Sequence, residues 1–404
     1  MRTTNGARVL SFLLFATGAA VLAGCPGEED VSDGGADGAA DGNHVVTQTT
    51  GAGGRGVDAG QTPPGTGGGA LPPPTSGTGG HVGAGTGGAP LPPPGTGGHV
   101  IAGTGGAPGA QAGLDYVFVI AMENEPASAI YGSSSAPYIN NELLPKYAHA
   151  TGFTDPLPDG IPSEPHYVWM EAGTNKFSDV TFSDDGDPSS GNSTKSTAHL
   201  TTQMGAASPP VSWLGYMEGL NSSTGACPIR SSGVYGAKHD PFVFFQDVAG
   251  SPPSTSKAFC ADHHRPYAAD TFAQDLSQVK VAQYNFISPN LCHDMHGDSA
   301  CPSGNVITAG DTWLSTTLPP LIAFVNAHHG VIFVVWDEPE GGSNLIPFIA
   351  IGPTVKANYT GRVAYTHSSL TKTVEEIFGL PILPSGAGAN DFGDLFQQSP
   401  QAAP

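Results

Sequence analysis

The sequence contains two similar apolar stretches, Asp115-Tyr-Val-Phe-Val-Ile120 and Gly330-Val-Ile-Phe-Val-Val335. The first runs into Met122-Glu123-Asn124 and the second into Trp336-Asp337-Glu338. Continuous β-branched runs of this kind are typical of strands buried on both faces, as in a parallel sheet covered by helices. In such sheets, ligands bind outside the carboxyl ends of the strands. Three carboxylates and an amide at one edge repel one another unless a cation holds them, so the pattern predicts a metal site.

The N-terminus has the organisation of a secretory signal. Arg2 and Arg8 precede an apolar run over residues 9–22, and small residues follow. This arrangement predicts a signal peptide over residues 1–24. The alternative, an uncleaved anchor helix, is disfavoured because the run is short for a membrane span.

The cysteine at the end of this segment predicts an anchor. Cys25 directly follows Leu-Ala-Gly, which resembles a bacterial lipoprotein signal in which that cysteine is lipidated and becomes the mature N-terminus. We therefore expect an exported lipoprotein held at a membrane by its lipid. By the same resemblance, Pro26 in place of aspartate favours the outer membrane or cell surface.

Residues 25–112 have the composition of a tether. Gly, Pro and Thr dominate, and Gly-Thr-Gly-Gly-His-Val occurs twice, at 77–82 and 95–100. Such a composition buries too little apolar surface to offset the entropy of ordering. One histidine per repeat is a weak ligand set, so we interpret the segment as a disordered spacer rather than a metal-binding array.

The rest of the chain predicts one large domain over residues 113–396, with a short disordered tail at 397–404. The whole sequence has 14 basic against 35 acidic residues, a formal charge of −21. This balance excludes nucleic acid as an expected partner and disfavours adsorption to anionic lipid, since both need clustered Lys and Arg. An anionic substrate would then be captured by bound cations. We expect a monomer.

Four cysteines remain after the lipidation site, and an even number in an exported protein suggests disulfides. Of the three possible pairings, we favour the one that closes local loops, Cys227–Cys260 and Cys292–Cys301. The alternative is a Cys/His zinc cluster that includes Cys292 and His293. It lacks any CxxC pair.

Ser163 stands at the predicted start of a helix over residues 163–172, after a Pro-rich loop. The simplest interpretation is an N-cap. The same place offers a hydroxyl at the positive end of a helix, where a phosphate is favoured. A metal would lower the pKa of that hydroxyl and make it a nucleophile.

A cluster of ionisable residues follows a predicted strand at Tyr284–Ile287. His293, Asp294, His296 and Asp298 fall within six residues. A solvated loop is one interpretation and a group of metal ligands is the other. Further on, we expect Asp311 to be the N-cap of a helix that continues through Val325.

His367 opens a predicted amphipathic helix with Leu370, Val374, Ile377 and Phe378 on one face and Gly379 as its C-cap. An imidazole is a poor helix cap. A metal ligand is the more economical interpretation of His367.

Seven motifs together resemble the phosphoesterase family, which contains bacterial phospholipases C and acid phosphatases within the alkaline-phosphatase-like superfamily. The resemblance covers nearly all of residues 113–385. The motifs, in order, are Met122-Glu-Asn124, Ser163-Glu-Pro-His-Tyr167, Lys238-His-Asp-Pro-Phe242, Ser288-Pro-Asn-Leu-Cys-His-Asp-Met-His296, Gly310-Asp-Thr-Trp-Leu314, Trp336-Asp-Glu338 and Tyr365-Thr-His367.

The resemblance implies an α/β fold, a three-layer α/β/α sandwich around a mostly parallel sheet. It places Ser163 at the nucleophile position and His239 at a phosphate-contacting or leaving-group position. The remaining implied residues are metal ligands. The primary cluster would be Glu123, Asn124, Asp337 and Glu338, and the further ligands would be Asp294, His296 and His367.

The implied activity is hydrolysis of a phosphoric ester by a divalent metal enzyme, with Mg²⁺, Ca²⁺, Mn²⁺ or Zn²⁺ as the cofactor. We favour an acid-phosphatase-type phosphomonoesterase that works through a phosphoseryl intermediate. The alternatives are a phospholipase C-type phosphodiesterase acting on a phospholipid headgroup and an inactive surface binding protein. His166 and His293 stand where the acid-phosphatase branch has asparagine, a difference that bears on substrate preference.

Overall fold

The computed structural model describes residues 113–221, 225–339, 341 and 343–400. The predicted signal peptide, Cys25 and the tether lie outside these residues. Within the described part of the chain, no helix combines the length and apolar character needed to cross a bilayer. Of the predicted tail, residues 397–400 are described, and the Gln397 N–H donates to the carbonyl of Thr354 at 2.9 Å.

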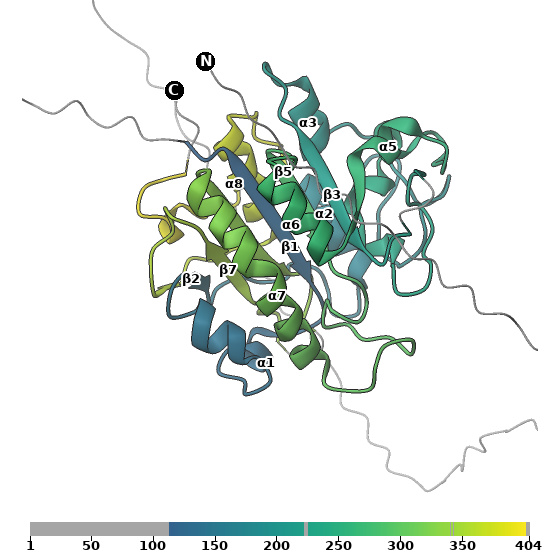
Figure 1. Cartoon of the computed structure of the whole chain (residues 1–404). Coiled ribbons are helices and arrows are strands. Elements are labelled where there is room, and N and C mark those ends of the chain that lie inside the picture. Colours follow the sequence, from purple (N-terminus) through teal and green to yellow (C-terminus); the bar gives the residue numbers. More distant parts are fainter. Residues whose placement is uncertain (1–112, 222–224, 340, 342, 401–404) are drawn as a thin grey trace, which may run out of the picture. The chain divides into compact units, whose positions relative to one another are not determined.

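The domain is built on an eight-stranded sheet with the order β4-β3-β5-β1-β6-β7-β2-β8 (Figure 1). β7 runs antiparallel to its neighbours β6 and β2, and the other neighbouring pairs are parallel. The expected mostly parallel sheet is therefore confirmed. The strands are β1 Tyr116–Met122, β2 Ala148–Ala150, β3 Trp213–Glu218, β4 His264–Tyr267, β5 Tyr284–Ser288, β6 Gly330–Trp336, β7 Phe348–Ile351 and β8 Tyr359–Gly361.

The two apolar stretches form the adjacent central strands β1 and β6. Every residue of β6 is buried, as is β1 from Val117 onward, which explains the unbroken apolar runs. The register places Met122 opposite Trp336, so both strands end at the same level. Glu123 and Asp337 therefore leave the sheet side by side, and the Asp337 N–H donates to the carbonyl of Met122 at 3.0 Å.

Helices cover both faces of the sheet. Figure 1 shows α6 and α7 in front of it and α2 and α8 behind it, and each pair packs together. The result is the predicted three-layer α/β/α sandwich. The α-helices are α1 Ala127–Ile130, α2 Ser163–Ala172, α3 Leu200–Ala206, α4 Gln246–Ala249, α5 Ala258–His263, α6 Ala269–Ser277, α7 Val306–Ala327 and α8 His367–Phe378. Short π or 3-10 turns are η1 Ile139–Leu143, η2 Ala237–His239, η3 Pro241–Phe244 and η4 Gly393–Leu395.

The prediction for Asp311 is wrong. α7 begins earlier, at Val306, and the side chain of Asn305 caps it by accepting from the Thr308 N–H at 2.9 Å. Asp311 lies inside α7, where its carboxylate accepts from the N–H groups of Tyr138 and Ile139, both at 2.9 Å. Asp311 therefore accepts hydrogen bonds from the N–H groups that are left without partners at the start of η1, a helix more than 160 residues away in the chain.

α8 and the disulfides follow the predictions. α8 begins at His367 and ends at Gly379, whose φ of 65° is the left-handed C-cap conformation. The disulfides are Cys227–Cys260 and Cys292–Cys301. Since the Cys292 sulfur is bonded to Cys301, the alternative of a Cys/His zinc cluster is wrong.

A buried ionic cluster ties α2, α3 and α4 together. The His199 Nδ1 lies 2.9 Å from Glu171 Oε1, and its Nε2 lies 3.1 Å from Asp247 Oδ2. Burial alone would lower the pKa of His199, but the hydrogen bonds with Asp247 and Glu171 outweigh it and raise the pKa to about 8. The folded protein therefore favours the charged imidazolium.

His199 predicts a pH dependence of stability. A folded pKa above the unfolded value gives stability that is complete below about pH 6.5 and is lost as the pH rises through about 8. We expect the free energy of unfolding of the wild type to fall by up to about 2 kcal/mol more than that of His199→Gln between about pH 6 and pH 9. Denaturant titration at both values measures it. His329→Gln, at a largely exposed histidine, is the control and should follow the wild type. Equal slopes for wild type and His199→Gln would contradict the prediction.

Candidate active site

The carboxyl ends of β1 and β6 form the floor of the candidate site. Glu123 and Asp337 are both fully buried there. Asn124 has a φ of 56°, a left-handed conformation that asparagine tolerates, and its N–H donates to Asp337 Oδ1 at 3.0 Å. This turn links the two acidic clusters that the sequence places 213 residues apart.

Ser163 is the first residue of α2 and points at the carboxylates. Pro162 occupies the N-cap position, so the interpretation of Ser163 as an N-cap is wrong. The Ser163 hydroxyl instead donates to Glu123 Oε2 at 3.0 Å and lies 3.4 Å from Glu338 Oε1. A buried hydroxyl thus sits between two acids at the positive end of a ten-residue helix.

His239 contacts the carboxylate oxygen of Glu123 that Ser163 does not contact. Its Nε2 is 3.1 Å from Glu123 Oε1, and its Nδ1 is 3.4 Å from Asp294 Oδ2. The ring stacks on Tyr167 with 4.9 Å between centroids, which fixes its plane. Asp294 comes from the loop after β5, and its carbonyl accepts from the Glu123 N–H at 2.8 Å.

The two remaining predicted ligands approach from different directions. The His296 ring lies 6.0 Å from that of His239, centroid to centroid. His367 lies at the start of α8, and its Nε2 forms a hydrogen bond of 2.6 Å to the carbonyl oxygen of Asp337. Its buried Nδ1 has no hydrogen-bond partner. The predicted residues therefore gather around one sheet edge, although they do not all meet at one point.

The electrostatics of the cluster fit a bound cation. Burial raises the pKa of Glu123, Asp294 and Asp337 well above the usual range, and repulsion between these acids adds to the effect. Burial also raises the pKa of Glu338 to about 7. Asp337 Oδ2 is buried without a hydrogen-bond partner. A divalent ion would neutralise these acids and satisfy that oxygen, so the residues present suit such a group.

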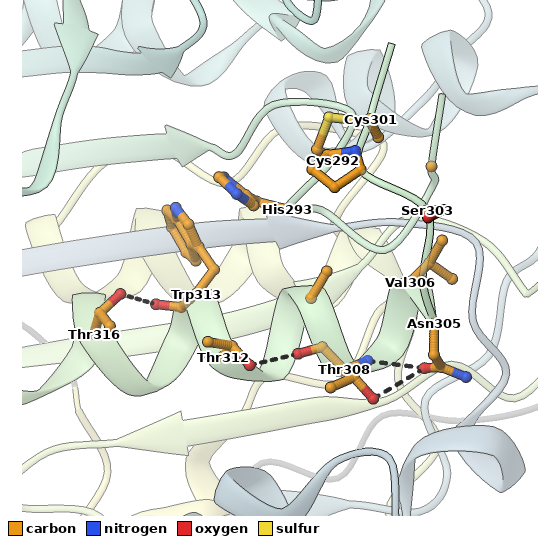
Figure 2. A pocket seen from close by; sticks show the side chains of 14 residues that line it. Cys292, His293, Cys301, Ser303, Asn305, Val306, Thr308, Thr312, Trp313 and Thr316 are labelled. Atoms are coloured by element: carbon orange, nitrogen blue, oxygen red, sulfur yellow. Dashed lines mark hydrogen bonds between the residues drawn. A yellow bond between two sulfur atoms is a disulfide. The ribbon is translucent and has the colours of Figure 1, made fainter. Parts of the chain in front are cut away.

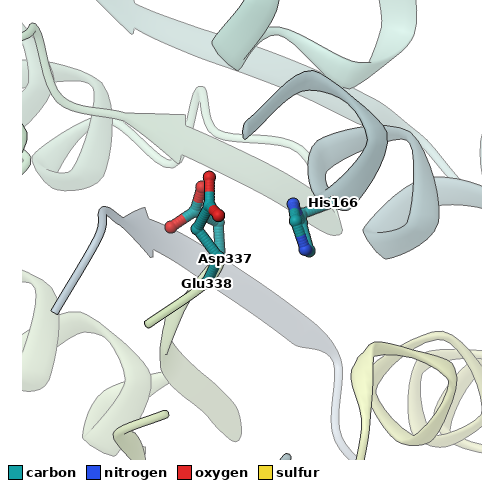
Figure 3. Close-up of side chains that lie close together, drawn as sticks. All are labelled: His166, Asp337 and Glu338. Carbon is teal, nitrogen blue, oxygen red and sulfur yellow. The ribbon is translucent and has the colours of Figure 1, made fainter. Parts of the chain in front are cut away.

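His166 joins this cluster, a role that the sequence analysis missed. Its ring nitrogen and carboxylate oxygens of Asp337 and Glu338 lie within 4.8 Å of one another (Figure 3). His166 also contacts a further acid, Asp155, whose Oδ2 lies 3.1 Å from His166 Nε2. The available signal was the spacing, because Ser163 and His166 are three residues apart and share one face of a helix.

Lys238 is the second residue that the sequence analysis left without a role. It forms an ion pair of 2.6 Å with Asp185, whose other oxygen accepts from the Glu164 N–H at the start of α2. Its positive charge acts on Glu123 and lowers the pKa of that acid, against the larger effect of burial. Lys238 thus brings a positive charge close to the buried acids Glu123 and Asp337.

A pocket of about 510 Å³ lies next to the loop that carries Asp294 and His296 (Figure 2). The Cys292–Cys301 disulfide, His293 and Trp313 line it. His293 Nδ1 lies 2.9 Å from Glu218 Oε2, so this histidine contacts a residue outside the carboxylate cluster. The loop is therefore shared between the pocket and the candidate site.

Comparison with known proteins identifies the family. Residues 160–381 match the Phosphoesterase family. This chain belongs to that family. It is a hydrolase that acts on phosphoric ester bonds.

Relatives of this phosphoesterase include two named phosphatases. Phosphatidylinositol-3-phosphatase of Mycobacterium tuberculosis is 28% identical over 291 residues, which cover 70% of this chain and 82% of that protein. Phosphate-repressible acid phosphatase of Penicillium chrysogenum is 26% identical over 166 residues, 39% of this chain and 36% of that enzyme.

Solved structures show more distant similarity. A putative sulfatase from Bacteroides thetaiotaomicron VPI-5482 has a TM-score of 0.45 at 11% identity, covering 70% of this chain and 74% of that chain. Murine ectonucleotide pyrophosphatase / phosphodiesterase 5 has a TM-score of 0.43 at 12% identity, covering 70% of this chain and all of that chain.

The Cys292–Cys301 disulfide closes the loop that carries Asp294 and His296, so its removal should affect the site. For Cys292→Ala/Cys301→Ala, we expect a loss of about 3 kcal/mol in stability and a roughly tenfold loss in divalent-metal affinity, because the loop is no longer held. Denaturant titration and calorimetric metal titration measure the two effects. Cys227→Ala/Cys260→Ala is the matched control, with a stability loss of about 4 kcal/mol and metal affinity unchanged. The idea fails if both variants lose metal affinity equally.

Proposed function

We propose that this phosphoesterase is a metal-dependent phosphomonoesterase that uses Ser163 as its nucleophile. The observation that carries the proposal is the position of the Ser163 hydroxyl, 3.0 Å from Glu123 Oε2 and 3.4 Å from Glu338 Oε1 at the start of α2. A structural serine at a helix start would cap the helix, and this one does not. The names of the two phosphatase relatives support the same class of reaction.

The metal would be held by Glu123, Asn124, Asp337 and Glu338, with Asp294, His296 and His367 as the further ligand group. When bound, a divalent ion polarises the phosphate and lowers the pKa of a nearby hydroxyl. Oxygen ligands suit Mg²⁺, Ca²⁺ or Mn²⁺, and the histidines also suit Zn²⁺.

The residues of the chain then perform a two-step transfer. The Ser163 Oγ attacks phosphorus in line, forming a new P–O bond as the bond to the leaving oxygen breaks, and Glu123 Oε2 is placed to accept the hydroxyl hydrogen. The start of α2 and Lys238 face the negative charge of the phosphoryl group. His239 would contact the phosphate or the leaving oxygen. Water then attacks the phosphoserine, releasing phosphate and restoring the Ser163 hydroxyl.

The substrate that we propose is a phosphate monoester, either a small molecule or a phosphorylated lipid headgroup. The Ser-Glu-Pro-x-Tyr form of the nucleophile motif, here Ser163–Tyr167, favours the phosphatase branch over phospholipase C. The printed name of the mycobacterial relative extends the candidates to phosphoinositide headgroups.

Ser163→Ala tests the nucleophile. We expect hydrolysis of p-nitrophenyl phosphate to fall by at least about a thousandfold, since removing a nucleophile abolishes the covalent route. Thermal melting of the variant should stay close to the wild type. In the wild type, rapid acid quench followed by mass spectrometry should find phosphate on the peptide that contains Ser163.

Two controls make this experiment specific. Ser134→Ala, at an exposed serine, should retain the full rate. Chelation should stop the wild type, and a divalent ion should restore it. A Ser163→Ala variant that keeps most of its rate would remove Ser163 as the nucleophile. Faster turnover of p-nitrophenyl phosphorylcholine than of the monoester would favour the phosphodiesterase alternative.

We also propose that Cys25 carries a lipid that holds the enzyme at the outer membrane or cell surface. The support is the sequence around this residue, Leu22-Ala-Gly-Cys25. Cys25→Ala should move most of the protein from the membrane fraction to the soluble fraction, because a lipid chain is then no longer attached. Fractionation followed by immunoblotting measures the change. Unchanged membrane fractionation would exclude this anchor.

A further inference from the structure

Asp185 caps helix α2 from another segment of the chain. Pro162, at the N-cap position, makes no side-chain hydrogen bond, and the Ser163 hydroxyl donates to Glu123 instead of capping the helix. Asp185 Oδ1 takes this role by accepting from the Glu164 N–H at 3.0 Å. A carboxylate is favoured at this end of a helix because it satisfies a free N–H group and faces the positive end of the dipole. The contact therefore places Asp185 next to the nucleophile that we propose.

The side chain of Glu164 holds the segment that carries Asp185. Glu164 has no exposed surface, and its Oε2 accepts from the Gly186 N–H at 2.7 Å and from Asn192 Nδ2 at 3.1 Å. Each of the two acids thus accepts a backbone hydrogen from the segment that carries the other. These reciprocal contacts resemble a capping box, and they fix Asp185 against the first turn of α2.

The second oxygen of Asp185 holds Lys238. Asp185 Oδ2 lies 2.6 Å from Lys238 Nζ, and the side chains of Asp185 and Lys238 are 31% and 21% exposed, so a ligand can reach the pair. Lysine has three N–H donors, and the hydrogen bond to Asp185 uses one of them. A phosphoryl oxygen can accept from another donor without breaking the ion pair. Without the contact to Asp185, the flexible stem of the lysine would leave its ammonium group free to adopt many positions.

Lys238 is also close to the acids of the site. Burial lowers the pKa of Lys238, but the hydrogen bond to Asp185 and the charge of Glu123 outweigh it, so the ammonium group stays charged. The next residue, His239, contacts Glu123 Oε1 through Nε2 at 3.1 Å. The Ser163 hydroxyl donates to the other oxygen of Glu123. One carboxylate therefore links Ser163 to the segment that carries Lys238.

We propose that Asp185 is a positioning residue, which holds the Lys238 ammonium group where one of its N–H donors meets a phosphoryl oxygen of the substrate. The inference rests on the proposed function and concerns a residue outside the set of candidate metal ligands. A cation that is already in place stabilises the negative charge of the phosphoryl group without reorganising during the reaction. An ion pair with no such role makes the opposite prediction. Removing Asp185 would then release Lys238 and subtract a negative charge, and both changes favour the binding of phosphate.

The test is Asp185→Asn. Asparagine keeps an oxygen that can accept from the Glu164 N–H, but it loses the ion pair with Lys238. With a divalent ion present, we expect kcat/KM for p-nitrophenyl phosphate to fall at least about tenfold and the Ki of inorganic phosphate to rise at least about tenfold. Asp184→Asn is the matched control, since it removes the same charge from an exposed neighbour and should behave as the wild type does. A Ki that falls or stays unchanged in Asp185→Asn overturns the inference.

A double-mutant comparison shows whether Asp185 acts through Lys238. Lys238→Met alone should lower kcat/KM at least about tenfold, because a charged donor to the phosphoryl group is lost. In that background, Asp185→Asn should cause less than about a twofold further loss, since no ammonium group is left to position. A further loss as large as the one in the wild-type background overturns the inference.

A crystal of the wild type soaked with inorganic phosphate and a divalent ion tests the geometry without a variant. Lys238 Nζ should lie about 2.7–3.2 Å from both Asp185 Oδ2 and a phosphate oxygen. Phosphate bound with no contact to Lys238 overturns the inference, even if Asp185→Asn does not fold.

The activity of the wild type separates the two proposals. If the wild type hydrolyses p-nitrophenyl phosphate and forms phosphoserine at Ser163 while Asp185→Asn leaves the Ki of phosphate unchanged, only the positioning role of Asp185 falls. If the wild type is inactive with every divalent ion, both proposals fall.

Discussion

The structure depends on the burial of several like charges at one end of a parallel sheet. Glu123, Asp294 and Asp337 have essentially no exposed surface, and each raises the pKa of another. Burying an isolated ionised carboxylate is unfavourable because it loses its hydration, and neighbouring acids make its ionisation still less favourable. The fold can hold these residues together because β1 and β6 are locked in register by packing on both faces. In the function that we propose, a bound cation would offset the repulsion between these acids.

Helix α2 is the second element on which the site depends. It brings Ser163 and His166 to the acids on one face, while its far end is fixed to α8. The Trp169 indole donates to Ser368 Oγ at 2.7 Å, and that hydroxyl donates to the carbonyl of Gly173 at 2.9 Å. Since His367 precedes Ser368, the same contacts keep His367 within hydrogen-bonding distance of the Asp337 carbonyl. One helix interface therefore positions groups on two sides of the cluster.

The third element that positions site residues is the loop between β5 and α7, which has little regular structure of its own. Asp294 and His296 lie between Cys292 and Cys301, and the disulfide replaces the restraint that a helix or strand would give. Met295 has a left-handed φ of 86° and a buried side chain, so the loop turns sharply between the two candidate ligands. A covalent restraint of this kind suits the exported enzyme that we propose.

The sequence by itself predicted the strands β1, β5 and β6, the acids that follow β1 and β6, and the α8 boundaries, and it favoured the disulfide pairs that form. These features depend on local information, namely apolar periodicity, caps and the spacing of cysteines. The tertiary structure decided what Ser163, Asp311 and His166 do. Serine and aspartate at a predicted helix start look like caps, and only the packing shows that Asp311 caps η1 and that Ser163 turns toward Glu123. The three-residue spacing of Ser163 and His166 indicates that they share one face of a helix. That this face meets Asp337 depends on the placement of α2 over the end of β6, a contact between segments about 170 residues apart in the chain.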